Sequence, residues 1–554
     1  MDALVVLAGI ELPAPVASRS RHIVHIKGPD VPADVLGDLR GRIPRSVGVF
    51  GPIQAATQCA TELHKAGLPV VLYLVDPADP VPAIDGVALR KAYDDGEAMD
   101  VANNLIELIG DTPMMRLDRT ARDLECTLLA KLEFFNPGGS TKDRPALNMI
   151  LEAERQGLLK PGGTIVEPTS GNTGVGLAIV AAQRRYKCVF VVPDKVAKEK
   201  ISLLRAYGAE VHVCPTSVEP DSPESYYSVA ERLTNEIPGA FRPNQYHNQA
   251  NPQAHTQTTG PEIWRQTAGR ITHFVAGAGT GGTLAGIGHY LKSMNPNVQV
   301  IAADPEGSVY SGGSGRPYLV EGVGEDFWPS TYDPAVVDRV IMVPDAESFS
   351  MARRVTKEEG LLIGGSSGMA VSAALEIARD LPADAVVVVL IPDSGRGYLS
   401  KVFDDGWMAD HGFLRAAGPT VGDLLSDKDS NIPALVHTHP HETVRTVISI
   451  FQEFGVSQMP VVKHEPPLQA AEVVGAVSEV GLMGAAFNDP TVLDNPVGDV
   501  MGAKLPQIGM GDTVDHAVRV LEQSEAVLVL DKGHPVGVVS RADVLEFLTK
   551  NQNT

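Results

Sequence analysis

Short apolar runs alternate with helical patterns along most of the chain. Two runs of strand length, Thr164–Val166 and Thr272–Ala276, each lead into a turn rich in glycine and hydroxyl residues. An apolar helical pattern follows each turn, over Val175–Ala182 and from about Leu284. Apolar runs of this length are typical of strands, and strands that alternate with helices are typical of α/β folds. The pattern therefore predicts an α/β protein.

The N-terminal region, residues 1–98, repeats this alternation on a smaller scale. It predicts a small α/β domain whose second helix ends near Gly67. No motif in the region indicates an activity, so a structural or interaction role is the preferred interpretation. The predicted strands are Leu4–Ala8, His22–Ile26, Ser46–Phe50 and Val70–Val75, and the predicted helices are Ala33–Arg40 and Gln54–Ala66.

The C-terminal region, from about residue 420 to 550, contains a tandem repeat. Residues 442–444 (Glu-Thr-Val) recur as 512–514 (Asp-Thr-Val), and each triplet opens an amphipathic helical pattern. The strand-like residues 474–478 recur as 536–540, and each strand leads into a helix. Two copies at a spacing of about 70 residues do not fit a solenoid, which needs more copies of a shorter unit. The repeat predicts two copies of one small module.

One segment between these regions places a lysine where it can do chemistry. Residues 136–144 (NPGGSTKDR) put Lys142 beside a glycine turn, where the helical pattern Pro145–Gln156 begins. A lysine in such a place can form a Schiff base with an aldehyde cofactor. Taken alone, the segment is weak evidence, because glycine-rich turns before helices are common and most lysines are solvated.

Three further segments also precede helical patterns. Residues 167–174 offer hydroxyls, an amide and backbone N–H groups to a carboxylate, although an ordinary capped turn is the alternative. Residues 277–283 suit a phosphate, because their glycines let the backbone approach closely. A dinucleotide site is disfavoured there, since the spacing is not G-x-G-x-x-G and no acidic residue stands about 20 residues later. Residues 364–368 are either another phosphate turn or a means of bringing a serine hydroxyl to a ring nitrogen.

Together the four segments resemble the fold-type II pyridoxal-phosphate enzymes of the tryptophan synthase β superfamily, and among these the cystathionine β-synthase family. The resemblance runs from about Asn103 to Phe413 and begins with the usual opening of the superfamily, Leu108–Pro113. It implies a core of two three-layer α/β subdomains. Four stretches are more similar to this family than to cysteine synthase: 221–225 (DSPES), 304–308 (DPEGS), 320–324 (VEGVG) and 392–396 (PDSGR).

The resemblance implies pyridoxal 5′-phosphate as the cofactor and assigns its contacts. It gives Lys142 the Schiff base and the proton transfers at the substrate Cα, Asn172 the ring hydroxyl, and Ser366 the pyridine nitrogen. A neutral serine does not hold that nitrogen protonated, which limits delocalisation into the ring and favours loss of a β-leaving group. The implied phosphate-binding residues are Gly279, Thr280, Gly281, Gly282 and Thr283.

The implied activity is that of a lyase that catalyses a β-replacement. It condenses L-serine with L-homocysteine to L-cystathionine and water, a step of transsulfuration and cysteine biosynthesis. Glu325 departs from the pattern, because the animal and fungal enzymes carry a tyrosine after the glycine that matches Gly324. Cysteine synthase, which uses O-acetylserine and sulfide, and a catalytically silent ligand sensor are the alternatives. The implied substrate-binding residues are Thr169, Ser170, Gly171, Thr173, Gln245, Tyr246 and Gly324.

The C-terminal repeat resembles a pair of CBS domains, which are βαββα modules that often bind adenosine compounds. In such modules an aspartate three residues after a Ser or Thr binds ribose hydroxyls, and Ser540 with Asp543 fits this pattern. The first copy has Gly481 in that place, so its site is expected to be empty or altered. S-adenosylmethionine or an adenine nucleotide is the expected regulator; the alternative is that both copies only support dimerisation. A homodimer or higher homo-oligomer is expected.

Composition narrows the class of protein. The 554 residues predict several domains, namely 1–98, 99–415 and 420–552, the last with copies at about 420–485 and 495–552. The net charge of −22, without a concentrated Lys/Arg run, disfavours nucleic acid and anionic membranes as partners. A cytoplasmic enzyme is favoured by three features: four cysteines without a C-x-x-C pair, no secretion signal, and no apolar run of about 20 residues.

Two possible metal centres are judged unfavourably. Cys59 and His64 fall on an apparent amphipathic helix whose surroundings do not match the haem-binding region of the animal enzymes, so haem is not expected. His437, His439 and His441 alternate on a loop or strand. A transition-metal site is conceivable there, but solvated histidines in linkers are common, and no metal is expected.

Overall fold

The computed structural model describes strands β1–β5 within residues 1–100, and then residues 101–551 except 170, 195, 197, 216, 217, 219–221, 417 and 429–432. The chain divides into two compact units, Met1–Glu107 with Arg265–Gly269, and Leu108–Trp264 with Arg270–Thr554. Ser170, and the predicted helices Ala33–Arg40 and Gln54–Ala66 with Cys59 and His64, lie outside the described residues.

The first unit contains a five-stranded parallel sheet in the order β2-β1-β3-β4-β5. The four strands predicted for this region are present to within one residue at each end. Strand β5 was not predicted, because only Ala88 and Leu89 of its four residues are apolar. The strands are β1 (Ala3–Leu7), β2 (Ile23–Ile26), β3 (Val47–Gly51), β4 (Val70–Leu74) and β5 (Ala88–Lys91).

Four further sheets lie in the second unit, two of them, β16-β17 and β18-β19-β20, in its C-terminal part. The other two sheets have the orders β14-β13-β12-β15-β7-β6 and β10-β9-β8-β11. Every pairing in them is parallel except β6 with β7. The strands are β6 (Met114–Arg116), β7 (Thr127–Leu132), β8 (Thr164–Pro168), β9 (Lys187–Pro193), β10 (Glu210–Cys214), β11 (Ala240–Phe241), β12 (His273–Gly277), β13 (Gln299–Pro305), β14 (Arg339–Val343) and β15 (Val386–Ile391).

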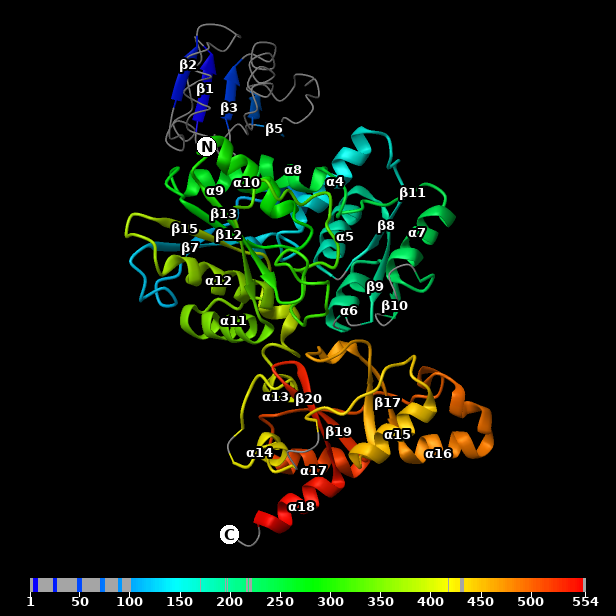
Figure 1. Cartoon of the computed structure of the whole chain (residues 1–554). Helices are drawn as coiled ribbons and strands as arrows, with labels where there is room; N and C mark the ends of the chain where they lie inside the picture. Colours follow the sequence, from blue (N-terminus) through cyan, green and yellow to red (C-terminus); the bar gives the residue numbers. More distant parts are fainter. Residues whose placement is uncertain are drawn as a thin grey trace. The chain divides into compact units, whose positions relative to one another are not determined.

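Helices cover both faces of the six-stranded sheet, with α10 on one face and α11 and α12 on the other (Figure 1). Alternate residues of β12 serve the two faces: Phe274 packs in the cluster with α10, and Val275 in the cluster with α12. The helices are α4 (Asp143–Arg155), α5 (Asn172–Arg184), α6 (Lys198–Ala206), α7 (Tyr226–Glu236), α8 (Ala250–Gln257), α9 (Thr259–Gln266), α10 (Gly282–Met294), α11 (Asp345–Glu359), α12 (Gly365–Ala378) and α13 (Asp405–Asp410).

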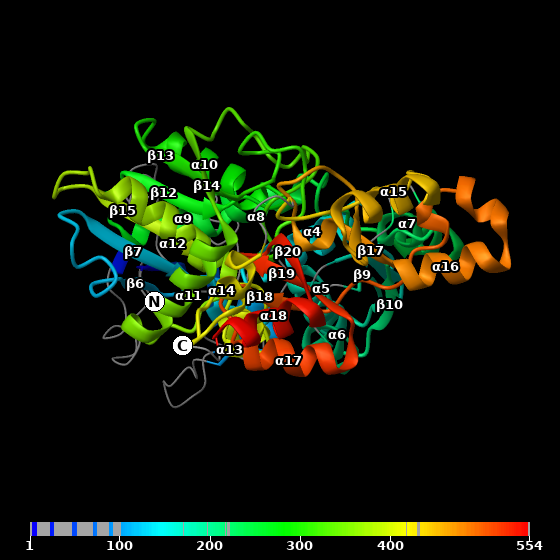
Figure 2. The same ribbon diagram turned by 60° about the horizontal axis from the view of Figure 1, so that its bottom comes forward.

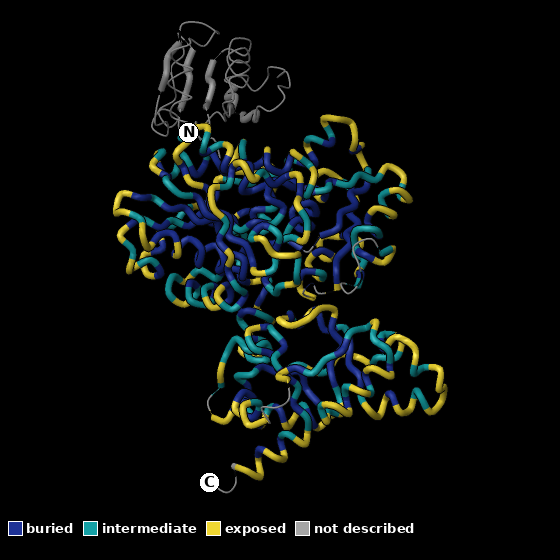
Figure 3. The backbone as a smooth tube through the Cα atoms, viewed as in Figure 1, coloured by how far each residue is buried: buried dark blue, intermediate teal, exposed yellow. Residues whose placement is uncertain are grey.

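Burial on both faces explains the continuous apolar runs. The sequence of β15 is Val-Val-Val-Val-Leu-Ile, and five of its six residues are buried. In the second unit, buried segments lie mainly in the interior and exposed ones mainly at the outside (Figure 3). Burying one such side chain contributes roughly 1.5–3 kcal/mol. The turns after β8 and β12 leave the carboxyl ends of their strands, which is where ligands bind in open α/β sheets.

The C-terminal part contains the two predicted copies. In each copy a threonine caps the first helix: the Oγ1 of Thr443 accepts from the N–H of Thr446, and that of Thr513 from the N–H of His516. Helices α17 and α18 pack beside β19 and β20 (Figures 1 and 2). The elements are α14 (Val421–Ser426), α15 (Val444–Phe454), β16 (Gln458–Val462), β17 (Val473–Ser478), α16 (Glu479–Asn488), β18 (Gln507–Gly509), α17 (Val514–Gln523), β19 (Ala526–Asp531), β20 (His534–Ser540) and α18 (Arg541–Asn551).

The α/β fold class is confirmed by these sheets and helices. Among the described residues, no helix combines the length and the apolar composition needed to cross a membrane.

Candidate active site

All four segments selected from the sequence meet at one cavity of about 250 Å³ in the second unit. Most of the predicted cofactor and substrate residues line it. They are Lys142, Thr169, Asn172, Thr173, Gln245, Tyr246, Gly279, Thr280, Gly281, Thr283, Gly324 and Ser366. Of the predicted residues that the structure describes, Gly171 and Gly282 are not part of the lining.

Lys142 stands immediately before helix α4 and faces this cavity. Removal from water lowers the pKa of its amine, and the charges of Glu325 and Asp393 oppose that change without cancelling it. Among the residues that the structure describes, none accepts a hydrogen bond from Lys142 Nζ. A lysine with a lowered pKa has a larger neutral fraction, which is the form that attacks a carbonyl carbon or takes up a proton.

The turn between β12 and α10 requires glycine for two separate reasons. Gly281 has a φ of +80°, and a Cβ there would lie 2.4 Å from the Cβ of Tyr332. A Cβ on Gly279 would lie 2.8 Å from the carbonyl oxygen of Gly322. The carbonyl oxygens of Gly279 and Thr280 accept from Tyr310 and Thr331 at 2.6 Å each. The N–H of Gly282 donates to Thr280 Oγ1 at 3.4 Å, and the remaining N–H groups at the start of α10 are left to bind an anion.

The turn after β8 is held by hydrogen bonds within the second unit. The Oγ1 of Thr169 accepts from the N–H groups of Gly171 and Gly174, both at 3.2 Å. Thr173 Oγ1 donates to Gln245 Oε1 at 2.7 Å, which brings two predicted substrate residues together. Burial raises the pKa of Glu167 to about 7, although the hydrogen bonds that its carboxylate accepts from two backbone N–H groups oppose this rise.

Asp393 is a site residue to which the sequence assigned no role, although it falls in the stretch 392–396. Its Oδ2 accepts from Asn172 Nδ2 at 2.8 Å and from the hydroxyl of Tyr398 at 2.7 Å. Burial raises the pKa of Asp393, while the nearby Lys200 lowers it in part. The contact fixes the orientation of the Asn172 amide within the cavity wall.

A charged group in the cavity wall was also missed. Glu321 accepts from Lys200 Nζ and from Lys401 Nζ, both at 2.6 Å. Burial would raise the pKa of Glu321, but the two ammonium charges outweigh burial and lower it. Glu325 lines the same cavity. No local motif marks Lys200 or Lys401, which come from distant parts of the chain, whereas Glu321 falls within the stretch 320–324 and Glu325 follows it directly.

A network of buried ion pairs holds the start of helix α4 in place. Arg144 donates to Glu133 Oε2 and to Glu262 Oε1, both at 2.7 Å, and Lys131 donates to Glu262 Oε2 at 2.6 Å. All four side chains are at most 8% exposed. Arg144 follows Lys142 by two residues, so the network fixes the start of the helix that positions the lysine.

Ser540 and Asp543 lie at the start of α18. Asp543 Oδ2 accepts from the N–H of Ser540 at 2.6 Å and from its hydroxyl at 2.7 Å, and it pairs with Lys428 at 2.9 Å. In the first copy, Ser478 Oγ accepts from the N–H of Gly481 at 3.1 Å, so no carboxylate stands there. The two copies therefore differ at the predicted ribose position.

Comparison with known proteins identifies the class first. A family model described as pyridoxal-phosphate dependent enzyme matches residues 105–393, and a CBS domain model matches residues 497–550. The catalytic core is thus that of a pyridoxal-phosphate enzyme.

Individual relatives then identify the family. Cystathionine beta-synthase of Apis mellifera is 39% identical over 82% of this chain and 92% of the relative. The enzyme of the same name from Oryctolagus cuniculus is 40% identical over 80% of this chain and 84% of the relative. A solved structure of an O-acetylserine dependent cystathionine beta-synthase from Helicobacter pylori has a TM-score of 0.52 and 40% identity, and covers 55% of this chain and 99% of its own. The chain belongs to the cystathionine beta-synthase family.

The residues present fit pyridoxal phosphate, the cofactor of this family. Lys142 supplies a partly buried amine of lowered pKa. The N-terminus of α10 offers an anion site without a charged side chain, in a turn where two added Cβ atoms would collide with neighbours. Ser366, 4% exposed at the start of α12, supplies a neutral hydroxyl to the cavity.

Proposed function

We propose that the chain condenses L-serine with L-homocysteine to L-cystathionine and water. The single observation that carries the proposal is the position of Lys142, whose amine shares one cavity with an anion-binding helix start and a separate hydroxyl-rich turn. The similarity to cystathionine beta-synthases over most of their length supports it.

When bound, the cofactor supplies an electron sink for the carbanion at the substrate Cα. Lys142 takes the proton from that carbon and later returns it. Thr169, Thr173 and Gln245 hold the substrate carboxylate by hydrogen bonds, together with Ser170 and Gly171. The hydroxyl of serine and the thiol proton of homocysteine leave as water, so the atoms of the exchange balance.

The same arrangement supports the proposed cofactor contacts. Residues 279–283 would hold the phosphate at the start of α10. Ser366 would meet the pyridine nitrogen with a neutral hydroxyl, and Asn172, oriented by Asp393, would meet the ring hydroxyl. Tyr246 and Gly324 lie in the wall on the substrate side.

The charged wall favours an amino-acid thiol over sulfide as second substrate. Lys200 and Lys401 share one carboxylate, that of Glu321, so the group carries a net positive charge that suits the carboxylate of homocysteine. Glu325 suits its ammonium group. Sulfide has neither group to bind. Lys401→Met is expected to raise KM for homocysteine severalfold and to leave KM for sulfide unchanged, and equal changes for both thiols would contradict this assignment.

Cysteine synthase remains the second candidate, since a Staphylococcus aureus cysteine synthase is 45% identical over 56% of this chain. Initial rates with serine and with O-acetylserine, at matched concentrations of homocysteine or sulfide, separate the two. Faster turnover of O-acetylserine with sulfide than of serine with homocysteine would assign the chain to the second reaction.

The decisive experiment concerns Lys142. The purified protein is expected to show visible cofactor absorbance that serine shifts and homocysteine restores, and reduction followed by mass spectrometry is expected to place the cofactor on Lys142. Lys142→Ala should lose the covalent adduct and the activity. An adduct on another lysine would overturn the assignment.

We further propose the organisation in which residues 99–415 form the catalytic domain and residues 420–552 the CBS module, in a cytoplasmic homodimer. S-adenosylmethionine or an adenine nucleotide binds beside Ser540 and Asp543, with a coupling to catalysis of about 1–3 kcal/mol. Titration of each compound against melting temperature and activity tests this. Analytical ultracentrifugation tests the dimer.

A further inference from the structure

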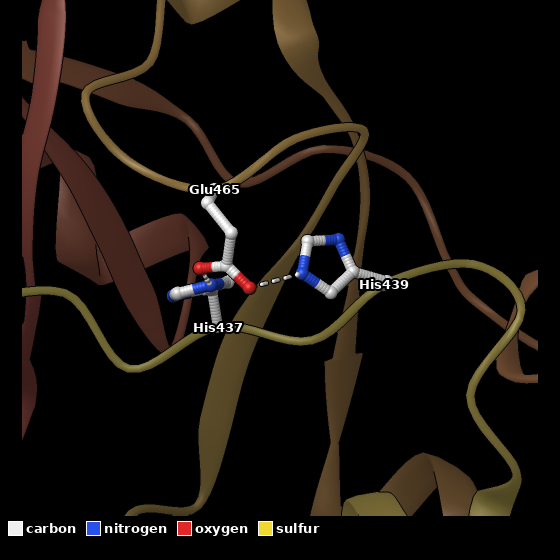
Figure 4. A group of neighbouring side chains, drawn as sticks. All are labelled: His437, His439 and Glu465. Atoms are coloured by element: carbon white, nitrogen blue, oxygen red, sulfur yellow. Dashed lines mark hydrogen bonds and ion pairs between the residues drawn. The ribbon is translucent and has the colours of Figure 1, made fainter.

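Three side chains of the first CBS copy converge on one point. His437 Nε2 lies 3.2 Å from Glu465 Oε2, and His439 Nε2 lies 3.1 Å from Glu465 Oε1 (Figure 4). The three candidate ligand atoms are all within 4.8 Å of one another. The histidines precede β16, whereas Glu465 follows it, so the fold and not a local motif assembles the group.

A backbone carbonyl oxygen fixes the tautomer of each histidine. His437 Nδ1 lies 3.1 Å from the carbonyl oxygen of Leu435, and His439 Nδ1 lies 3.0 Å from that of Val462. A carbonyl oxygen only accepts hydrogen bonds, so each Nδ1 carries the proton. In the neutral imidazole, each Nε2 then presents its lone pair to a carboxylate oxygen.

Lone pairs that face carboxylate oxygens repel unless a positive charge lies between them. Either two further protons or one cation meets that need. A histidine that donates its second N–H to a backbone carbonyl while Nε2 points at a shared centre is the usual arrangement of a metal ligand. Two imidazole nitrogens and one carboxylate also form a common zinc ligand set that leaves a fourth position open.

The spacing and the exposure agree with a metal. Ligands at about 2.0–2.1 Å from a tetrahedral zinc ion lie about 3.3 Å apart. His437 Nε2 lies 3.2 Å from Oε2 of Glu465 and His439 Nε2 3.1 Å from Oε1, and the candidate ligand atoms lie within 4.8 Å of one another, so one ion needs only a small contraction of the group. The histidine side chains are 18% and 14% exposed, and Glu465 is 77% exposed. The imidazoles are therefore held in place, while an ion can enter from solvent past the carboxylate.

We propose that His437, His439 and Glu465 bind one zinc ion, with water in the fourth position. The site adjoins a contact with the catalytic core. The loop of Glu465 continues to Pro467, whose carbonyl accepts from Arg316, and Arg316 also pairs at 2.8 Å with Glu472, which is 2% exposed. Zinc ties this loop to residues 437–439 and so restricts the segment through which the first copy contacts the core.

The experiment uses the cofactor-loaded full chain, without thiol substrate, dialysed against ZnCl2 and measured by elemental analysis and titration calorimetry. The wild type is expected to bind one zinc ion per chain that His437→Gln and His439→Gln each weaken by at least about tenfold. Glu465→Gln is the mildest ligand variant, because its side chain is largely in solvent. Circular dichroism and cofactor absorbance confirm that each variant is folded.

Two matched controls locate the ion. His464→Gln removes a neighbouring histidine that is 65% exposed, and it should leave zinc binding unchanged. His516→Gln tests the other candidate group, Asp410, Asp512 and His516. Cobalt(II) in place of zinc should show visible d–d bands that the His439→Gln variant lacks. The proposal is overturned if the wild type and the His437→Gln/His439→Gln double variant bind zinc equally. It is also overturned if zinc binding is lost only in His516→Gln.

Discussion

Replacing Glu133 by glutamine tests whether the buried network beneath α4 stabilises the core. Glu133 accepts four hydrogen bonds, from Arg144 Nε at 2.7 Å, Arg144 Nη2 at 2.8 Å, Thr112 at 2.6 Å and Asn136 at 3.1 Å. The glutamine amide has the same shape as the carboxylate, but its NH2 group would face hydrogen-bond donors where a carboxylate oxygen accepts from them. It also leaves the guanidinium with one carboxylate partner, Glu262, instead of two.

The magnitude follows from the pKa of the carboxyl group. Burial alone would raise the pKa of Glu133, but the charge and hydrogen bonds of Arg144 outweigh burial and lower it from 4.5 to about 2. A difference of this size corresponds to about 3 kcal/mol. Breaking a buried ion pair from one side typically costs 3–5 kcal/mol, so both routes predict a loss of about 3 kcal/mol.

Tryptophan fluorescence during urea unfolding measures the loss, because all three tryptophans, Trp264, Trp328 and Trp407, lie in the predicted catalytic domain. Glu152→Gln is the matched control. The pKa of Glu152 is also lowered to about 2, chiefly by the hydrogen bond from Arg155, but that pair lies at the surface and little change is expected. Equal stability of wild type and Glu133→Gln would refute the reasoning.

The pH dependence gives a second check on the same residue. The folded pKa lies below the unfolded one, so the stabilisation is complete above about pH 4.5 and is lost as the pH falls towards 2. The gap between wild type and Glu133→Gln should therefore be constant near neutral pH and should narrow only below about pH 4.5. A gap that narrows between pH 8 and 6 would point to another group.

Two other predictions each concern a single residue. Gly281→Ala is expected to weaken cofactor retention during dialysis, followed by absorbance, because of the 2.4 Å approach to Tyr332 Cβ and the φ of +80°. Gly312→Ala is the control, because its φ of +89° imposes similar backbone strain while the added Cβ meets nothing within 4 Å. Equal cofactor retention in the two variants would contradict this prediction. Burial raises the pKa of Cys188 to about 12, so iodoacetamide at mildly alkaline pH should modify this thiol only after unfolding, as judged by peptide mass spectrometry.

The predictable parts of the fold are those buried on both faces. The buried residues of such strands must be apolar, as are Phe274–Ala276 in β12 and all six residues of β15, and runs of this kind are visible in the sequence. Strand β11 has only two residues and no pattern of its own; it exists because Ala240 and Phe241 pair with the edge of β8. The βα turns were predictable for a similar reason, because glycine and hydroxyl residues are needed wherever a backbone closely approaches an anion.

The unpredictable parts of the site are those that only tertiary structure assembles. Lys200 and Lys401 carry no local motif, and they meet at Glu321 from opposite directions along the chain. The same holds for the histidines of the first CBS copy. His439 stands out in the sequence, but its partner Glu465 lies 26 positions away and reaches it only because β16 returns the chain. Spacing along the sequence therefore understates the potential for metal binding.

The helices around the cavity and those of the C-terminal module begin with different N-cap residues. Helices α5, α10 and α12 have glycines as N-cap residues, Gly171, Gly281 and Gly364, which have no side chain to occupy the first N–H groups. In the C-terminal module, by contrast, Thr443 and Thr513 cap their helices with their own hydroxyls. A hydroxyl cap satisfies N–H groups of the first turn internally, whereas a glycine N-cap leaves them to other partners. Thr169 takes the N–H of Gly174 in α5 and Thr280 that of Gly282 in α10, and the remaining N–H groups can face an external anion. Three such helix starts around one cavity offer N–H groups to anionic ligands with few positive side chains, in a chain whose net charge is −22.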